Sequence, residues 1–186
     1  MKPFALFLAG ILALGVAVFA RQQAPAQQQP PTLVVEVQNM FNPIKGNITK
    51  SAEQFPEEKY TWQPTPEVRS WARLIAHITD DNNGACFALA GVERPPRVDS
   101  EDTVNSAANK MKKADLQKGL ADSFALCDKA FSVVTPENMM ERNVNRSKIG
   151  TLMYNTSHIN EHYGNLVTYM RLNGMVPPST AARMKK

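Results

Sequence analysis

The chain has 186 residues, a length that leaves room for one domain with a core of ordinary size, and its net charge is +4. An isolated run of lysines, Lys110, Lys112 and Lys113, has no aromatic residues among it. Such a run is typical of the solvated start of a helix, so we expect no binding to nucleic acid.

The first 31 residues differ from the rest of the sequence. Lys2 precedes an apolar run from Phe4 to Phe19, and Val18-Phe19-Ala20 fits a small-x-small cleavage site. We therefore expect a signal peptide over residues 1–20, a periplasmic or secreted protein, and no membrane attachment after cleavage. The alternative is a membrane anchor, but the apolar run is shorter than the ~20 residues of a spanning helix. Residues 21–31 are rich in Gln and Pro and should form a disordered linker.

Four later segments have apolar residues spaced three and four apart, as amphipathic helices do. We expect these helices over residues 33–52, 71–90, 114–134 and 148–173. Ser70 is a good N-cap for the second helix, and typical stop signals follow the helices at Pro56, Gly91, Pro136 and Gly174. The pattern predicts an all-α fold, a four-helix bundle over residues 32–179, with a flexible tail over residues 180–186.

The two cysteines, Cys86 and Cys127, lie in the second and third expected helices. In an exported protein they can form a disulfide across these helices, closing a loop of about 40 residues. The alternative is a pair of buried thiols that pack as small apolar side chains.

All three histidines occupy the middle of expected helices. His158 and His162 are four residues apart, which places both imidazoles on one face of the fourth helix. His77 lies beside Leu74 and Ile78 on the second helix and should point into the bundle. A lone histidine there would be a hydrogen-bonded core residue, but three together favour a metal site.

Further polar residues accompany the histidines. Asp81 lies one turn after His77 and is our candidate catalytic residue: it could orient that imidazole, act as a base for bound water, or be a fourth ligand. Its alternative is a carboxylate at the wet mouth of the bundle. Cys86 is turned to the opposite side of the helix from His77 and is a poor ligand. A polar line, which should need buried partners, continues along the fourth helix through Thr151, Asn155, His158, His162, Asn165 and Tyr169.

Three neutral imidazoles leave at least one coordination position open, which is typical of catalytic rather than structural metal sites. The ligand type does not select the metal, so we expect a divalent transition metal such as Zn, Ni or Fe.

Two stretches carry a family resemblance: residues 158–179, HINEHYGNLVTYMRLNGMVPPS, and residues 55–71, FPEEKYTWQPTPEVRSW, followed by His77. They resemble the DinB/YfiT-like metal-binding four-helix bundles. The resemblance implies an up-down-down-up bundle whose metal ligands are His77, His158 and His162. Asn165 is a departure, because many relatives have Gln there.

The resemblance implies function less specifically than fold. Characterised relatives include thiol-dependent transferases and an isomerase, so a metal-dependent transferase or hydrolase acting on an unknown small molecule is one hypothesis. A non-catalytic periplasmic bundle that binds a metal or ligand is the second, and a homodimer is compatible with either. The third is a zinc peptidase, because His158, Glu161 and His162 fit the H-x-x-E-H pattern.

Overall fold

The computed structural model describes residues 31–99 and 106–184. The predicted signal peptide, residues 1–20, and nearly all of the predicted linker, residues 21–31, lie outside the described residues. No helix in the described ranges is both long enough and apolar enough to cross a membrane.

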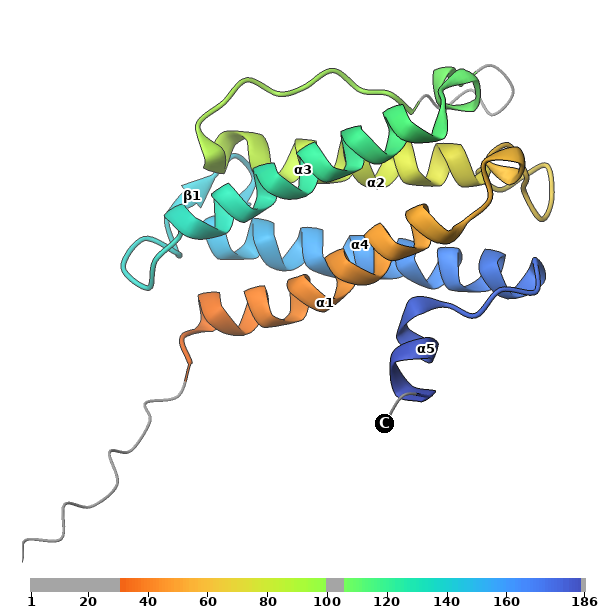
Figure 1. The fold of residues 1–186 in the computed structure, drawn as a ribbon. Coiled ribbons are helices and arrows are strands. Elements are labelled where there is room, and N and C mark those ends of the chain that lie inside the picture. Colours follow the sequence, from red (N-terminus) through yellow and green to blue (C-terminus); the bar gives the residue numbers. More distant parts are fainter. Residues whose placement is uncertain (1–30, 100–105, 185–186) are drawn as a thin grey trace, which may run out of the picture. The chain divides into compact units, whose positions relative to one another are not determined.

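The described chain is almost entirely helical (Figure 1), so the prediction of an all-α fold is confirmed. The four long helices are α1 (Leu33–Gln54), α2 (Trp71–Ala90), α3 (Lys113–Val133) and α4 (Lys148–Leu172). Each lies within two residues of its predicted ends, because the caps determine where the helices stop. The Ser70 side chain accepts a hydrogen bond from the Arg73 backbone N–H (3.3 Å), and Gly91 adopts the left-handed conformation with φ 68°.

Smaller elements lie between and after these helices. They are two 3-10 turns, η1 (Glu57–Lys59) and η2 (Ala107–Lys110), a short antiparallel hairpin of β1 (Arg142–Asn143) and β2 (Arg146–Ser147), and a final helix, α5 (Pro178–Met184). The hairpin and α5 were not predicted. The structure has a helix where we expected a flexible tail from residue 180, and backbone hydrogen bonds from Thr180 and Ala181 to Pro177 begin it.

Contacts between named residues give the relative directions of the helices. Near the start of α2, Ser70 meets Asn109, and near its end Cys86 meets Cys127 of α3, so α2 and α3 run in the same direction. The α4 helix runs opposite to α2, because Tyr169, late in α4, reaches back to Arg69. Figure 1 shows α2 beside α3 and α1 beside α4.

An aromatic cluster joins the end of α1 to the start of α2. The rings of Phe55 and Trp71 are stacked with centroids 3.7 Å apart, and both side chains are fully buried. The buried Tyr60 closes this cluster by donating a hydrogen bond to the Ala52 carbonyl oxygen (2.6 Å). This packing fixes the start of α2 and therefore the position of the histidine one and a half turns further along it.

Candidate metal centre

The structure brings the three histidines together between α2 and α4. One ligand atom from each of His77, Asp81, His158 and His162 lies within 4.8 Å of the others. The centroids of the His77 and His162 rings are 4.7 Å apart, and those of His158 and His162 are 4.6 Å apart. The predicted grouping of all three histidines is therefore present in the fold.

Asp81 lies at the centre of this group. Its Oδ2 atom is 3.2 Å from Nε2 of His77, 3.3 Å from Nε2 of His158 and 3.6 Å from Nε2 of His162. The Nε2 atoms of His158 and His162 are 3.2 Å apart. Three imidazole nitrogens and one carboxylate oxygen thus converge on one small volume from two helices.

The centre is closed on one side and open on the other. The side chains of His77 and His162 are only 12% and 7% exposed, whereas those of Asp81 and His158 are 22% and 27% exposed. A molecule from solvent therefore reaches the centre past Asp81 and His158.

Burial keeps the inner imidazoles neutral. It lowers the pKa of His77 to about 3, with a further lowering by the positive charge of Arg69. It also lowers the pKa of His162 to about 4, with His158 contributing in the same direction. Burial raises the pKa of Asp81, an effect that the neighbouring His158 partly opposes. Unprotonated imidazoles at neutral pH are what metal ligation requires.

The atoms left without hydrogen bonds fit a metal ion. Asp81 Oδ2, which faces all three Nε2 atoms, is buried and accepts no hydrogen bond from any described residue. A buried carboxylate oxygen in that state is costly unless a cation lies beside it. Nitrogen ligands with one oxygen suit Zn, Ni or Fe equally, so the donor set does not select among them.

A second carboxylate lies behind His77. Asp99 belongs to the connection between α2 and η2, and its Oδ2 atom is 3.6 Å from His77 Nδ1, the ring nitrogen that faces away from the centre. The side chain is buried and accepts hydrogen bonds from Arg69 Nε (3.0 Å), Arg73 Nε (3.0 Å) and Ser106 Oγ (3.3 Å). Asp99 was not predicted from the sequence, because a buried carboxylate in an aperiodic connection has no local signal.

The predicted polar line along α4 is only partly buried. Asn155 is buried and donates a hydrogen bond to Asn82 Oδ1 (2.9 Å), while Asn82 donates to Ser123 Oγ on α3 (3.1 Å). Asn165, which we expected in this buried line, is exposed to solvent and lines a cavity.

Glu161 and Cys86 lie outside the centre. The Glu161 side chain is 71% exposed, and its carboxylate is 3.7 Å from Nδ1 of His158, on the far side of the ring from the cluster. Cys86 forms a disulfide with Cys127, which confirms the predicted bridge and agrees with its exclusion as a ligand.

An aromatic stack supports the exposed histidine. The Tyr154 ring is stacked on the His158 ring, with their centroids 5.6 Å apart. The Arg146 guanidinium lies over the Tyr154 ring, 4.0 Å from the ring centroid. Arg146 comes from β2, so the unpredicted hairpin limits the orientations open to His158.

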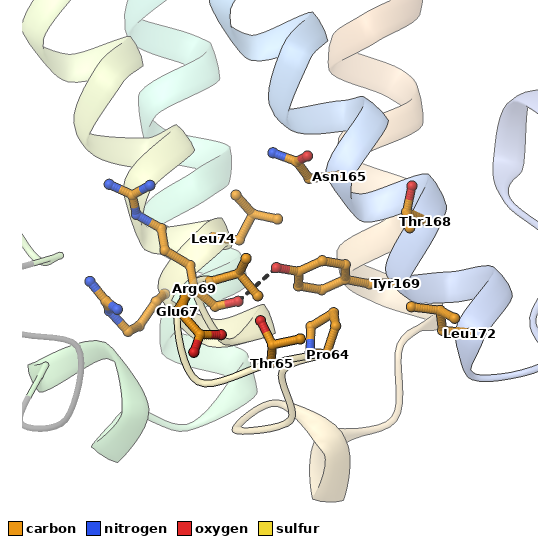
Figure 2. Close-up of a pocket in the computed structure, with 11 residues that line it drawn as sticks. Pro64, Thr65, Glu67, Arg69, Leu74, Asn165, Thr168, Tyr169 and Leu172 are labelled. Atoms are coloured by element: carbon orange, nitrogen blue, oxygen red, sulfur yellow. Dashed lines mark hydrogen bonds between the residues drawn. The ribbon is translucent and has the colours of Figure 1, made fainter.

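Among the cavities of the described residues, two lie on either side of the histidines along α2 and α4. The larger, about 540 Å³, is built from the loop before α2 and the end of α4, and none of the cluster residues lines it. Figure 2 shows Tyr169 reaching across it from α4, and its hydroxyl donates to the Arg69 carbonyl oxygen (2.9 Å). The smaller, about 210 Å³, is lined by Asp81 and His158 themselves.

The sequence that forms this site also matches a known protein family. The model of the DinB superfamily matches residues 45–171, a span that includes all three histidines and Asp81. The chain belongs to the DinB superfamily. No curated protein matches the sequence. The predicted family is confirmed, while the reaction and its substrate are not given by family membership.

Proposed function

We propose that this DinB-superfamily protein binds one divalent transition metal ion through Nε2 of His77, His158 and His162, with Asp81 beside the ion. The observation that carries the proposal is the convergence of three Nε2 atoms on the unsatisfied, buried Oδ2 of Asp81. A buried carboxylate that accepts no hydrogen bond is unfavourable in a protein core, but together with neutral histidines it forms a good cation site.

We further propose that the protein is a metal-dependent hydrolase or transferase acting on a small molecule. The open side of the centre, formed by Asp81 and His158, adjoins the 210 Å³ cavity, which is large enough for a small ligand. A bound ion there would supply Lewis-acid polarisation or lower the pKa of a bound water or thiol. Asp81 supports this role, because its Oδ2 atom lies 3.2–3.6 Å from the three Nε2 atoms, where it is placed to accept a proton from a water or thiol bound to the ion.

The geometry gives less support to a zinc peptidase. The glutamate of an H-x-x-E-H site must reach the ion's bound water, and Glu161 is exposed beside Nδ1 of His158, away from the Nε2 atoms. His77 instead occupies the third ligand position.

We also propose that the protein works outside the cytoplasm, on the basis of the signal-peptide pattern in residues 1–20 and a disulfide that persists in oxidising compartments.

Metal analysis of the purified protein tests the proposal. Wild-type protein should hold close to one transition metal ion per chain, and His77→Ala, His158→Ala and His162→Ala should each remove most of it, because two remaining imidazoles hold such ions weakly. Glu161→Gln is the matched control, an exposed neighbour on the same helix that should retain the ion. Full occupancy in a folded His158→Ala, His162→Ala double variant would refute the site.

A hydrolase and thiol-transfer activity screen then separates an enzyme from a metal-binding bundle without turnover. Activity should disappear on chelation and return when metal is added back. A protein that binds its metal but turns over nothing in the screen would leave the non-catalytic function as the better one.

A further inference from the structure

The smaller cavity is the route from solvent to the metal centre. It measures about 210 Å³ and lies between the second half of α2, the first half of α4 and the connection that follows α2. Its lining includes the two most exposed members of the cluster, Asp81 and His158, so a molecule bound here contacts the centre directly. The other lining residues are Asp80, Gly84, Ala85, Arg94, Tyr154 and Asn155.

Arg94 is the one cationic side chain among these lining residues. Its guanidinium packs on the bare backbone of Gly84, with Nη2 only 2.9 Å from where a Cβ atom would lie. The guanidinium is also 6.0 Å from the centre of the Phe87 ring. A glycine at position 84 is what allows Arg94 to lie this close to α2, one helical turn beyond Asp81.

The carboxylates near Arg94 already have other partners. Asp80 accepts hydrogen bonds from the backbone N–H groups of Val98 (3.0 Å) and Asp99 (2.8 Å), and it lies 3.9 Å from Arg97 Nε. Asp81 faces the histidines. Among residues 31–99 and 106–184, no carboxylate forms an ion pair with Arg94.

We propose that the 210 Å³ cavity is the substrate pocket and that Arg94 binds a carboxylate of the substrate. This proposal rests on the proposed metal-dependent function and names the substrate class: a small molecule with a carboxylate at one end and a metal-binding or reacting group at the other. A planar guanidinium suits a carboxylate, which it binds through two parallel hydrogen bonds. A pocket with this single guanidinium and the carboxylates of Asp80 and Asp81 favours a ligand with one negative charge over a phosphate with two.

The distance between the two ends follows from the helix. Gly84 is three residues after Asp81, which separates them by about 4.5 Å along the axis of α2. The guanidinium packed on Gly84 and the centre at Asp81 are thus about one helical turn apart, so the probe is a short molecule with two or three bonds between its carboxylate and its reacting group.

Cobalt-loaded protein tests the pocket without requiring the natural substrate. The probe is 3-mercaptopropionate, whose thiolate binds Co²⁺ and produces a near-ultraviolet absorption band. The matched neutral probe is 3-mercaptopropionamide, which has the same length but no charge. We expect wild-type protein to bind the carboxylate at least about tenfold more tightly than the amide, as a charge-assisted bidentate contact does.

Two variants and one control assign the preference to Arg94. Arg94→Gln should reduce the preference to about that of the thiols for free Co²⁺, and Gly84→Ala should weaken it by displacing the guanidinium. Alanine favours helix over glycine, so Gly84→Ala should fold at least as well as wild type and carries the test if Arg94→Gln does not fold. Arg97→Gln removes a neighbouring positive charge outside the pocket and should retain the full preference.

The outcomes separate the two proposals. Wild-type protein that takes up cobalt but binds both thiols equally overturns the carboxylate pocket alone, as does an Arg94→Gln variant that retains the full preference. Wild-type protein that takes up no cobalt overturns the metal centre and the pocket together.

Discussion

At the scale of single residues, Asp99 is remote in sequence from the other residues of the site but lies close to His77 Nδ1, which forms no hydrogen bond with any described residue. A histidine that binds a metal through Nε2 usually has its Nδ1–H held by a carboxylate or carbonyl, which fixes the ring and raises its basicity. Asp99 is the carboxylate placed for this role, with Oδ2 3.6 Å from His77 Nδ1. Arg69 and Arg73 bind the same carboxylate and hold it in place.

We therefore expect Asp99→Asn to lower metal affinity by about 10- to 100-fold, because the amide cannot stabilise the imidazole as a carboxylate does. The measurement is competition for Zn²⁺ against a chromophoric chelator. The control is Asp80→Asn, whose amide oxygen can still accept the Val98 N–H and hold the same connection to α2. Equal losses in the two variants would mean that Asp99 acts only by fixing the connection.

At the scale of elements, the second half of α2, next to the metal centre, is held to α3. The disulfide between Cys86 and Cys127 joins them, with Cα atoms 5.1 Å apart. One turn earlier, the buried amide of Asn82 bonds Ser123 on α3 and Asn155 on α4. These contacts fix the second half of α2, which carries Asp81 and Gly84.

Removal of the disulfide should cost stability while preserving the fold. The bridge closes a loop with a sequence separation of 41, and such a cross-link contributes about 2–4 kcal/mol, mainly by restricting the unfolded chain. We expect Cys86→Ala, Cys127→Ala to lower the free energy of unfolding in urea by that amount. Wild-type protein unfolded under reducing conditions retains both sulfur atoms and should lose a similar amount. A loss in the double variant alone would assign the effect to packing.

The elements also show which features can be predicted from sequence. The four long helices have local signals, since apolar spacing defines their faces and Ser70, Gly91 and the prolines define their ends. The histidine pair on α4 follows from its spacing alone. The hairpin has no such signal, because its strands are two residues long and Val144 in its turn adopts a positive φ of 51° that valine rarely takes.

In the site, likewise, the residues with a local sequence signal could be predicted and those placed by tertiary contacts could not. His77, His158 and His162 were found because helix periodicity points their side chains inward. The central position of Asp81 depends on how α2 packs against α4. From the sequence alone, Asp81 could orient His77, act as a base or be a fourth ligand. Asp99 and Arg94 reach their positions through the connection after α2, whose path is determined by tertiary contacts such as those from Asp80 to Val98 and Asp99.

At the scale of the whole molecule, the metal centre exists only when the bundle is folded. Its ligands come from α2 and α4, which are separated in the chain by α3 and by two connections. The unfolded chain leaves the three imidazoles in water, where their pKa is about 6.5. Folding buries two of them and lowers the pKa of His77 to about 3 and that of His162 to about 4.

This difference makes the stability of the metal-free protein depend on pH with a defined sign. Between pH 6.5 and about 4 the unfolded chain binds more protons than the folded chain, so protonation favours unfolding. The stability is complete above pH 6.5 and should fall as the pH decreases through this window. Burial also raises the pKa of Asp80 and Asp81, and their protonation in the folded chain opposes this trend. The histidine contribution is therefore measured against a variant that keeps both aspartates.

We expect the urea midpoint of chelator-treated protein to decrease steadily from pH 7 to pH 5. A His77→Gln, His162→Gln variant lacks both buried imidazoles and should show a shallower decrease over the same range. Parallel curves for the two proteins would contradict the assignment, because the proton uptake would then arise elsewhere. A bound ion should also raise the wild-type midpoint across this pH range, since the metal binds only the folded chain, whose buried imidazoles are already unprotonated.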